Sequence, residues 1–251
     1  MSGHSKWSSI KHQKGVADAR RGQLFTKLTK EIIISVRESG GNPDTNFKLR
    51  LAVQKARDNN MPLENIERAI KRGSGELEGV TLVEMVLEGY GPGGSAILVE
   101  VLSDNRNRTL PEIRNIFSRS GGSLGESGCV AWLFDSKGLI MVETNGLDTE
   151  ELALQAIDAG AEDVSIEDTH VEIYTRTEEL EKVRESLEQA NIPIASAELA
   201  MLPKTTLQLN EKAALQTLKL LHKLEELDET RSVYSNVDFP NAVLEKYQEQ
   251  G

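Results

Sequence analysis

The stretch KGLIMVETNGLDTEELALQAIDAGAEDVSIEDTHVEIYTRTEELEKVRESLEQANIPIASAELAML, residues 137–202, decides the fold. Apolar alternation with period two and apolar stripes with period 3.6 succeed one another along it, in the order strand, helix, strand, strand, helix, strand. This order is that of a complete ferredoxin-like split βαβ unit, and we predict such an α/β domain over residues 137–203. The predicted elements are Leu139–Val142, Glu150–Asp158, Asp163–Ile166, Val171–Thr175, Glu178–Gln189 and Ala195–Met201.

The segments on either side of this stretch are each too small to close a core. We therefore predict that residues 78–136 and 204–251 form one α/β domain, which the ferredoxin-like domain interrupts. A helix is expected to start at Thr109, because Thr109 and Glu112 have the spacing of a capping box. The other predicted elements are strands at Thr81–Tyr90, Ser95–Leu102, Val130–Phe134 and Arg231–Val237 and a helix at Asn210–Leu227.

Residues 1–77 are predicted to form a helical domain. Amphipathic helices are expected over Asp18–Glu38, over Asn46–Asn59 and from Pro62 to Gly73. Helices this short cannot bury their apolar stripes alone, so they should pack as a three-helix bundle. The apolar stripes consist of Leu24, Leu28, Ile32 and Val36, of Leu49, Ala52, Val53 and Ala56, and of Leu63, Ile66 and Ile70. The predicted class is therefore α+β, with the helical domain followed by two α/β domains.

Charge is divided unequally along the chain. Residues 1–75 carry 15 Lys and Arg against 7 Asp and Glu, a net charge of +8, whereas the remaining 176 residues carry 14 against 33, a net charge of −19. Basic surfaces bind phosphate backbones through Coulomb attraction and counterion release. The asymmetry predicts a basic N-terminal module that contacts a polyanion and an acidic body that repels it.

Signatures of catalysis are missing. His4, His12, His170 and His222 lack metal-ligand spacing, and no nucleophile or nucleotide-binding motif occurs. The single Cys129 lies in an apolar run and is predicted to be a small buried thiol. We therefore expect no catalytic residues, no metal and no cofactor, with an enzyme using an interdomain cleft as the remote alternative.

The glycine-rich run Glu88–Gly94 joins two predicted strands. A phosphate-binding loop would instead lead from a strand to a helix N-terminus. The run is expected to be a hairpin turn that needs positive φ, with a backbone nest for phosphate as the alternative.

The N-terminus has no apolar core of a secretory signal, and no apolar run reaches the roughly 18 residues of a membrane span. Its scarcity of acids faintly resembles a mitochondrial presequence, but the stretch continues without a break into a patterned helix. The cytoplasm is the expected location, with no membrane partner.

Candidate nucleic-acid-binding residues fall into two groups within the basic module. In the first, basic side chains surround one aromatic, which suits phosphate contact and base stacking; the alternative is that the indole packs into the bundle. The second follows the polar faces of the helices, where an ordinary solvated surface is the alternative. The first group is Lys6, Trp7, Lys11, His12 and Lys14, and the second is Arg20, Lys27, Lys30, Arg37, Lys48, Lys55, Arg68, Lys71 and Arg72.

A further candidate lies in the otherwise acidic body, in the run Asp104–Thr109. Arg106 and Arg108 stand between a strand end and a predicted helix N-terminus, where guanidinium groups, free amides and the helix dipole can share an anion. The alternative is that both arginines pair with local acids.

Several of these motifs together resemble the YebC/PmpR family over essentially the whole chain. The departures are small: Ser8 and Ser9 replace the commoner Ala and Asn, and Gln13 replaces the commoner Arg, which removes one candidate phosphate contact. The resemblance implies a helical N-terminal domain, two α/β domains, and DNA binding in transcriptional regulation, while related members act in translation on the ribosome. The motifs are Ser2–Trp7, Ile10–His12, Lys30–Ile32, Asn59–Pro62, Asn65–Ile70, Glu88–Gly94, Asp104–Thr109 and Gly121–Glu126.

The sequence thus predicts a non-enzymatic nucleic-acid-binding regulator, with a DNA-binding transcriptional regulator as the first interpretation. A ribosome- or RNA-associated translation factor is the alternative, because no recognition helix rich in base-reading side chains stands out. No small-molecule substrate is evident.

Overall fold

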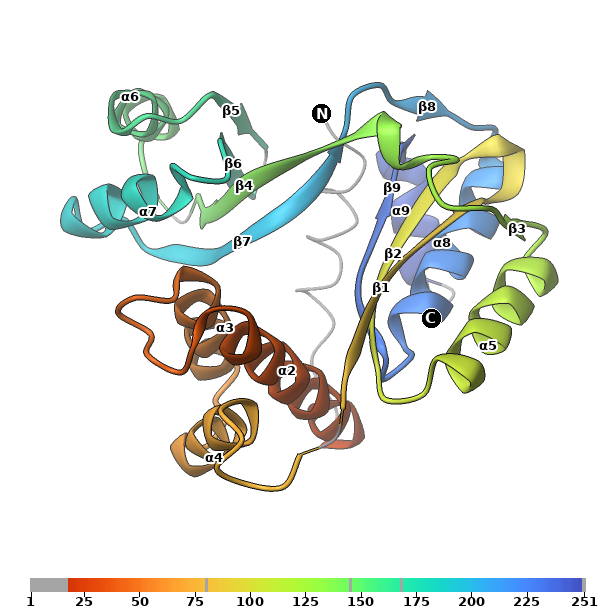
Figure 1. The fold of residues 1–251 in the computed structure, drawn as a ribbon. Coiled ribbons are helices and arrows are strands. Elements are labelled where there is room, and N and C mark those ends of the chain that lie inside the picture. Colours follow the sequence, from red (N-terminus) through yellow and green to blue (C-terminus); the bar gives the residue numbers. More distant parts are fainter. Residues whose placement is uncertain (1–17, 80, 145, 168, 250–251) are drawn as a thin grey trace. The chain divides into compact units, whose positions relative to one another are not determined.

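The computed structural model describes residues 18–79, 81–144, 146–167 and 169–249 (Figure 1). Asp135–Leu202 forms one compact unit, and the described residues before and after that stretch form a second. Helices come first along the chain and sheets follow, which confirms the predicted α+β class with an N-terminal helical region. The predicted boundary between residues 77 and 78 lies inside the second unit and stays a prediction.

The unit Asp135–Leu202 is a four-stranded antiparallel sheet with two helices. Its elements are β4 (Phe134–Glu143), α6 (Thr149–Ala159), β5 (Asp163–Ile166), β6 (His170–Thr175), α7 (Leu180–Gln189) and β7 (Ile194–Pro203). The strand order β5-β6-β4-β7 places the first and third strands at the centre, which confirms the ferredoxin-like topology. All six residues of β6 are buried, Val171 and Ile173 among them, as are Leu152 of α6 and Val183 of α7. β4 starts at Phe134, five residues before the predicted start at Leu139.

The second unit contains a sheet of order β3-β1-β2-β9. β9 comes after the ferredoxin-like stretch and pairs with β2, which comes before it. The interrupted α/β fold is therefore confirmed, since both flanks contribute to one sheet. Its elements are β1 (Val83–Tyr90), β2 (Ala96–Ser103), α5 (Arg106–Arg119), β3 (Ser123–Leu124), β8 (Leu207–Gln208), α8 (Glu211–Glu225), β9 (Thr230–Ser235), β10 (Val237–Asp238) and α9 (Asn241–Glu249).

One face of this sheet carries a hydrophobic core that it shares with the helices of the α/β fold. Val99 of β2 and Val233 of β9 are opposite each other in the register and pack with Phe117 of α5 and Leu218 of α8. Tyr247 of α9 joins the same core, in a helix that was not predicted from the sequence. Burial of these side chains at about 1.5–3 kcal/mol each is what holds the helices on the sheet.

The glycine-rich turn between β1 and β2 forms the 3₁₀ segment η1 (Pro92–Gly94). Gly93 and Gly94 have φ values of 72° and 80°. This confirms the predicted turn with positive φ, a conformation that glycine adopts without steric cost.

Two predicted elements of the middle segment are wrong. The helix α5 starts at Arg106, not at Thr109, because the side chain of Asn105 accepts the N–H of Arg108 and caps the helix four residues before the predicted cap. The predicted strand Val130–Phe134 is mostly the 3₁₀ segment η2 (Ala131–Leu133). Short apolar runs fit several conformations, and here local hydrogen bonding decides.

The helical region consists of α2 (Asp18–Ser39), α3 (Phe47–Asp58) and α4 (Leu63–Gly73), which share one core (Figure 1). Leu28 and Ile32 of the predicted stripe are buried, as is every residue of α2 from Glu31 to Val36. α2 contacts α3, α4 and also β9, so it is buried on more than one side. Leu63, predicted to be buried, is 58% exposed, because Ile66 and Ala69 provide the inward face of α4.

Asn46 connects the end of α2 to the start of α3. Its amide donates to the carbonyls of Ser35 and Gly40, at 2.7 Å each, and its oxygen accepts the N–H of Leu49 at 3.0 Å. Replacing Asn46 with Ala should lower the free energy of unfolding by about 2–3 kcal/mol, since the substitution removes a cap, one buried hydrogen bond and one part-buried hydrogen bond. Urea unfolding measures this. Asn42→Ala, which removes an exposed bond to Asp44, is the matched control and should cost less than about 1 kcal/mol.

Candidate nucleic-acid interface

Three basic residues form one exposed face of α4, which we call the α4 basic face: Arg68, Lys71 and Arg72. Their spacing of three and four residues places them within one turn of each other on the same side of the helix. Arg68 contacts Glu64 at 2.6 Å in an exposed ion pair, which contributes little to stability. Lys71 and Arg72 lie in the last turn, where the helix dipole favours cations. The face is thus positioned to offer positive charge to solvent.

A pocket of about 700 Å³ lies beside this face, between α2, α4 and the segment that follows α4. Lys30, Arg68 and Arg72 bring cations to its wall, and Glu78 and Asp104 bring acids. Thr26, Thr29 and Asn65 add hydrogen-bonding groups. The remaining lining residues, Phe25, Ile33, Ala69, Gly79 and Leu82, are mainly apolar.

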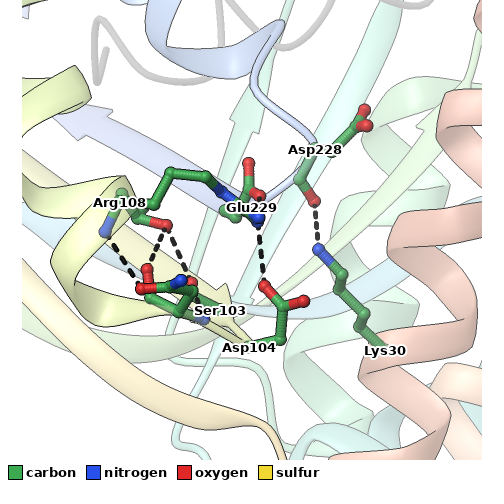
Figure 2. Close-up of polar contacts among 8 residues, drawn as sticks. Lys30, Ser103, Asp104, Arg108, Asp228 and Glu229 are labelled. Carbon is green, nitrogen blue, oxygen red and sulfur yellow. Dashed lines mark hydrogen bonds and ion pairs between the residues drawn. The ribbon is translucent and has the colours of Figure 1, made fainter. Parts of the chain in front are cut away.

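Lys27 and Lys30 on α2 contact the end of α8 and the turn that follows it. The ammonium group of Lys30 donates to the carbonyl of Asp228 at 3.0 Å (Figure 2). The ammonium group of Lys27 donates to the carbonyl of Glu225, the last residue of α8. Carbonyls at a helix C-terminus lack intrahelical donors and carry partial negative charge, so they suit cations. Both lysines are half-buried, and their ammonium groups donate hydrogen bonds to protein carbonyls rather than being fully solvated.

Charged side chains continue this contact toward the sheet. Glu31 of α2 is buried, and its carboxylate lies 3.3 Å from Lys55 Nζ and 4.0 Å from Arg231 Nε on β9. Tyr234 donates its hydroxyl to the carboxylate of Glu100 at 3.3 Å. Burial raises the pKa of Glu100, and the attraction of Arg231 opposes this only in part. The helical region therefore meets the sheet through paired charges.

The structure separates the two arginines of the run Asp104–Thr109. Arg108 contacts Asp104 at 2.9 Å and Glu229 at 2.7 Å (Figure 2). The hydrogen bond to Glu229 and the charge of Asp104 raise the pKa of Arg108 above its ordinary value. Arg108 thus follows the alternative of local pairing. Arg106 is exposed in the first turn of α5.

The other candidates of the helices differ in their surroundings. Lys48 contacts Glu38 at 2.7 Å in an exposed pair, and half-buried Lys55 contacts Glu31. Arg37 is exposed at the end of α2. Binding by any of these side chains stays a prediction.

The candidates of the N-terminal segment lie outside the described residues, as does the side chain of Arg20, whose backbone belongs to α2. The segment candidates are Lys6, Trp7, Lys11, His12 and Lys14.

Some residues of the basic surface were not singled out from the sequence. Arg57 is exposed in the last turn of α3. Asn65, Thr26 and Thr29 line the pocket, and uncharged side chains of this kind give no composition signal. The helical periodicity of α3 was sufficient to identify Arg57 as exposed. Asn65, Thr26 and Thr29 could be identified only once the packing of α2 against α4 was known.

Titratable groups elsewhere do not assemble a metal site within the described ranges. On β6, His170 Nε2 lies 3.0 Å from Glu172, whose carboxylate also accepts the hydroxyl of Tyr174. The hydrogen bond to Glu172 raises the pKa of His170. Cys129, predicted to be buried, is half-buried. Among the described helices, none is both long and apolar enough to cross a membrane.

Comparison with known proteins gives matches over nearly the whole chain. Residues 5–76 match the profile described as "TACO1/YebC protein N-terminal domain", and residues 82–237 match "TACO1/YebC second and third domain". A "Probable transcriptional regulatory protein" of Dehalococcoides mccartyi is 61% identical and covers all of both chains. A protein of the same description from Halothermothrix orenii is 51% identical, again over all of both chains. The crystal structure of a conserved hypothetical protein from Aquifex aeolicus has a TM-score of 0.87 at 48% identity, covering 94% of this chain and 97% of that one.

Proposed function

Because the chain belongs to the TACO1/YebC family, we propose that it is a non-enzymatic, DNA-binding transcriptional regulator whose basic helical region holds the nucleic acid. Relatives at 51–61% identity are named probable transcriptional regulatory proteins, which supports a regulatory role. The cytoplasm, expected from the sequence, belongs to this proposal.

The α4 basic face is the observation that carries the proposal. It is exposed, it lies in the part of the chain whose net charge is +8, and it contrasts with the net −19 of the remainder. A phosphate backbone gains most where cations gather. The polyanion is therefore expected to lie along α4 and to reach the pocket beside Lys30, where Arg68 and Arg72 meet the wall.

The composition of α4 supports binding through phosphates and shape more than through base edges. Bases are read mainly by Arg, Asn and Gln side chains that enter the major groove. Besides Arg68 and Arg72, which can equally contact phosphates, the eleven residues of α4 contain a single amide side chain, Asn65, and it lines the pocket. Structured RNA, recognised by shape and phosphate contacts, therefore fits the same surface. This observation favours a ribosome- or RNA-associated translation factor as the second candidate.

A competition experiment separates the two candidates. The full-length protein is bound to a fluorescent 30-base-pair DNA duplex at about 0.15 M salt and challenged with unlabelled DNA duplex or with a hairpin RNA of equal phosphate number. The proposal predicts that DNA displaces the probe at lower concentration than RNA does. The translation alternative predicts the reverse order, and co-sedimentation with ribosomes that RNase abolishes. If neither competitor displaces the probe at a concentration tenfold above the Kd, specific nucleic-acid binding is contradicted altogether.

A further inference from the structure

Two aromatic side chains are exposed together on the second unit. Tyr90, at the end of β1, is 41% exposed, and Trp132, in η2, is 65% exposed. The Tyr90 hydroxyl and the Trp132 indole N–H both donate to the carbonyl of Cys129, at 3.0 and 3.2 Å. Their polar tips thus converge on one atom while their rings remain accessible. Rigid Tyr and Trp side chains of this kind are typical binding anchors.

The loop that holds this pair is itself fixed by Glu88. The Glu88 carboxylate accepts backbone N–H groups from Gly128, Val130 and Ala131, at 2.6, 2.8 and 2.7 Å. The Glu88 carbonyl accepts the N–H of Gly125 at 2.8 Å. Because the loop is ordered before any partner arrives, less conformational entropy is lost on binding.

The charge around the aromatic pair is negative. Burial raises the pKa of the Cys129 thiol, and the charges of Glu88 and Glu126 raise it further. The Glu88 carboxylate accepts N–H groups on both sides of Cys129, and exposed Glu126 lies three residues before Cys129, so both bring negative charge to the loop where the two aromatic tips meet. The backbone N–H of Lys204 donates to the carbonyl of Leu133 at 2.8 Å, so a basic residue also borders η2. Residues 76–251 as a whole carry 14 basic against 33 acidic residues.

We propose that Tyr90 and Trp132 form a docking surface for a peptide segment of a partner protein that carries arginine or lysine. A cation above the face of an indole or phenol ring is attracted by the ring quadrupole. Exposed Glu126, in the same loop, adds Coulomb attraction for a cation. The same negative potential repels phosphate groups, which disfavours a nucleic-acid strand at this place. The surface is thus distinct from the α4 basic face and would let the protein contact a basic protein and a nucleic acid at once.

The test uses the full-length protein and a fluorescein-labelled 12-residue peptide of alternating Arg and Gly, measured by fluorescence anisotropy. Trp132→Leu keeps the charge and much of the apolar area but removes the aromatic face, so affinity should fall about five- to tenfold. Trp132→Phe keeps a weaker aromatic face and should cost only about two- to threefold. Glu126→Gln should weaken binding and reduce its salt dependence. Non-specific attraction to the acidic body is equal in both Trp132 variants and therefore cancels.

Two results would overturn the proposal. The first is equal peptide affinity for the wild type and Trp132→Leu. Tyr90→Leu serves as a second variant for the same comparison. Circular dichroism confirms that both variants are folded. The second is that Trp132→Leu weakens binding of a 12-nucleotide oligouridine but not of the peptide, which would make the pair a base-stacking surface. The outcome is independent of the proposed function, because variants of the α4 basic face report on nucleic acid alone.

Discussion

Replacing Arg68, Lys71 and Arg72 together with Gln is expected to weaken nucleic-acid binding on the order of 100-fold at about 0.1 M salt. Each phosphate that the variant no longer neutralises means about one counterion fewer released on binding, and the contribution of each grows as salt is lowered. The three residues are exposed on one face of α4, so a single backbone can touch them together. Fluorescence anisotropy with a DNA duplex measures the change.

The matched control removes the same number of positive charges from acidic parts of the chain. Arg176, Lys182 and Lys246 are exposed and form surface ion pairs with nearby acids. Their triple Gln variant should bind within about threefold of wild type, because distant exposed charges are screened at this salt. The free energy of unfolding of both triple variants should lie within about 1–2 kcal/mol of the wild-type value. Equal weakening in the two variants would show that net charge, and not the α4 basic face, governs binding.

Replacing Glu88 with Ala is expected to lower the free energy of unfolding by about 3–5 kcal/mol. The substitution leaves three backbone N–H groups, one buried and two part-buried, without their charged acceptor, and each unmet buried donor costs about 1–3 kcal/mol. Glu84 lies on the same side of β1 but is exposed, so Glu84→Ala should change stability by less than about 0.5 kcal/mol. Denaturant unfolding of the two variants makes the comparison, and similar small losses would contradict the anchoring role of Glu88.

The pH dependence of Glu88 has a definite sign. Burial alone would raise its pKa, but the three backbone hydrogen bonds outweigh burial and hold the pKa below the ordinary value. A carboxyl with a depressed folded pKa stabilises the protein above the unfolded value of about 4.3, and this contribution disappears as the pH falls through the lower folded value. The stability difference between wild type and Glu88→Ala should therefore be constant near neutrality and shrink below about pH 4.

The fold could be predicted from the sequence where periodicity was long and uniform. The strands and helices of residues 137–202 alternate cleanly, and their order is the observed ferredoxin-like topology. Prediction failed where hydrogen bonds between residues close in sequence decide between conformations. Asn105 caps α5 before Thr109 can, and Ala131–Leu133 turns as a 3₁₀ segment although its composition suits a strand.

The candidate site could be predicted only in part, because charge pattern identifies a basic helix face but not its neighbours. Lys71 and Arg72 are exposed, as their position opposite the apolar stripe implies. Lys27 and Lys30 have the same pattern on α2, yet they contact carbonyls at and beyond the end of α8. That contact joins residues about 200 positions apart, and no local pattern encodes it.

The most direct test of the account is the salt dependence of nucleic-acid affinity for wild type and for the triple Gln variant of Arg68, Lys71 and Arg72. The logarithm of the association constant for a DNA duplex is plotted against the logarithm of salt concentration between about 50 and 200 mM. If the α4 basic face contacts phosphates, the variant's slope should be shallower than the wild-type slope by about two to three, close to 0.9 for each phosphate that is no longer neutralised. Parallel lines with equal affinity would show that nucleic acid does not bind at this face, and would contradict the account.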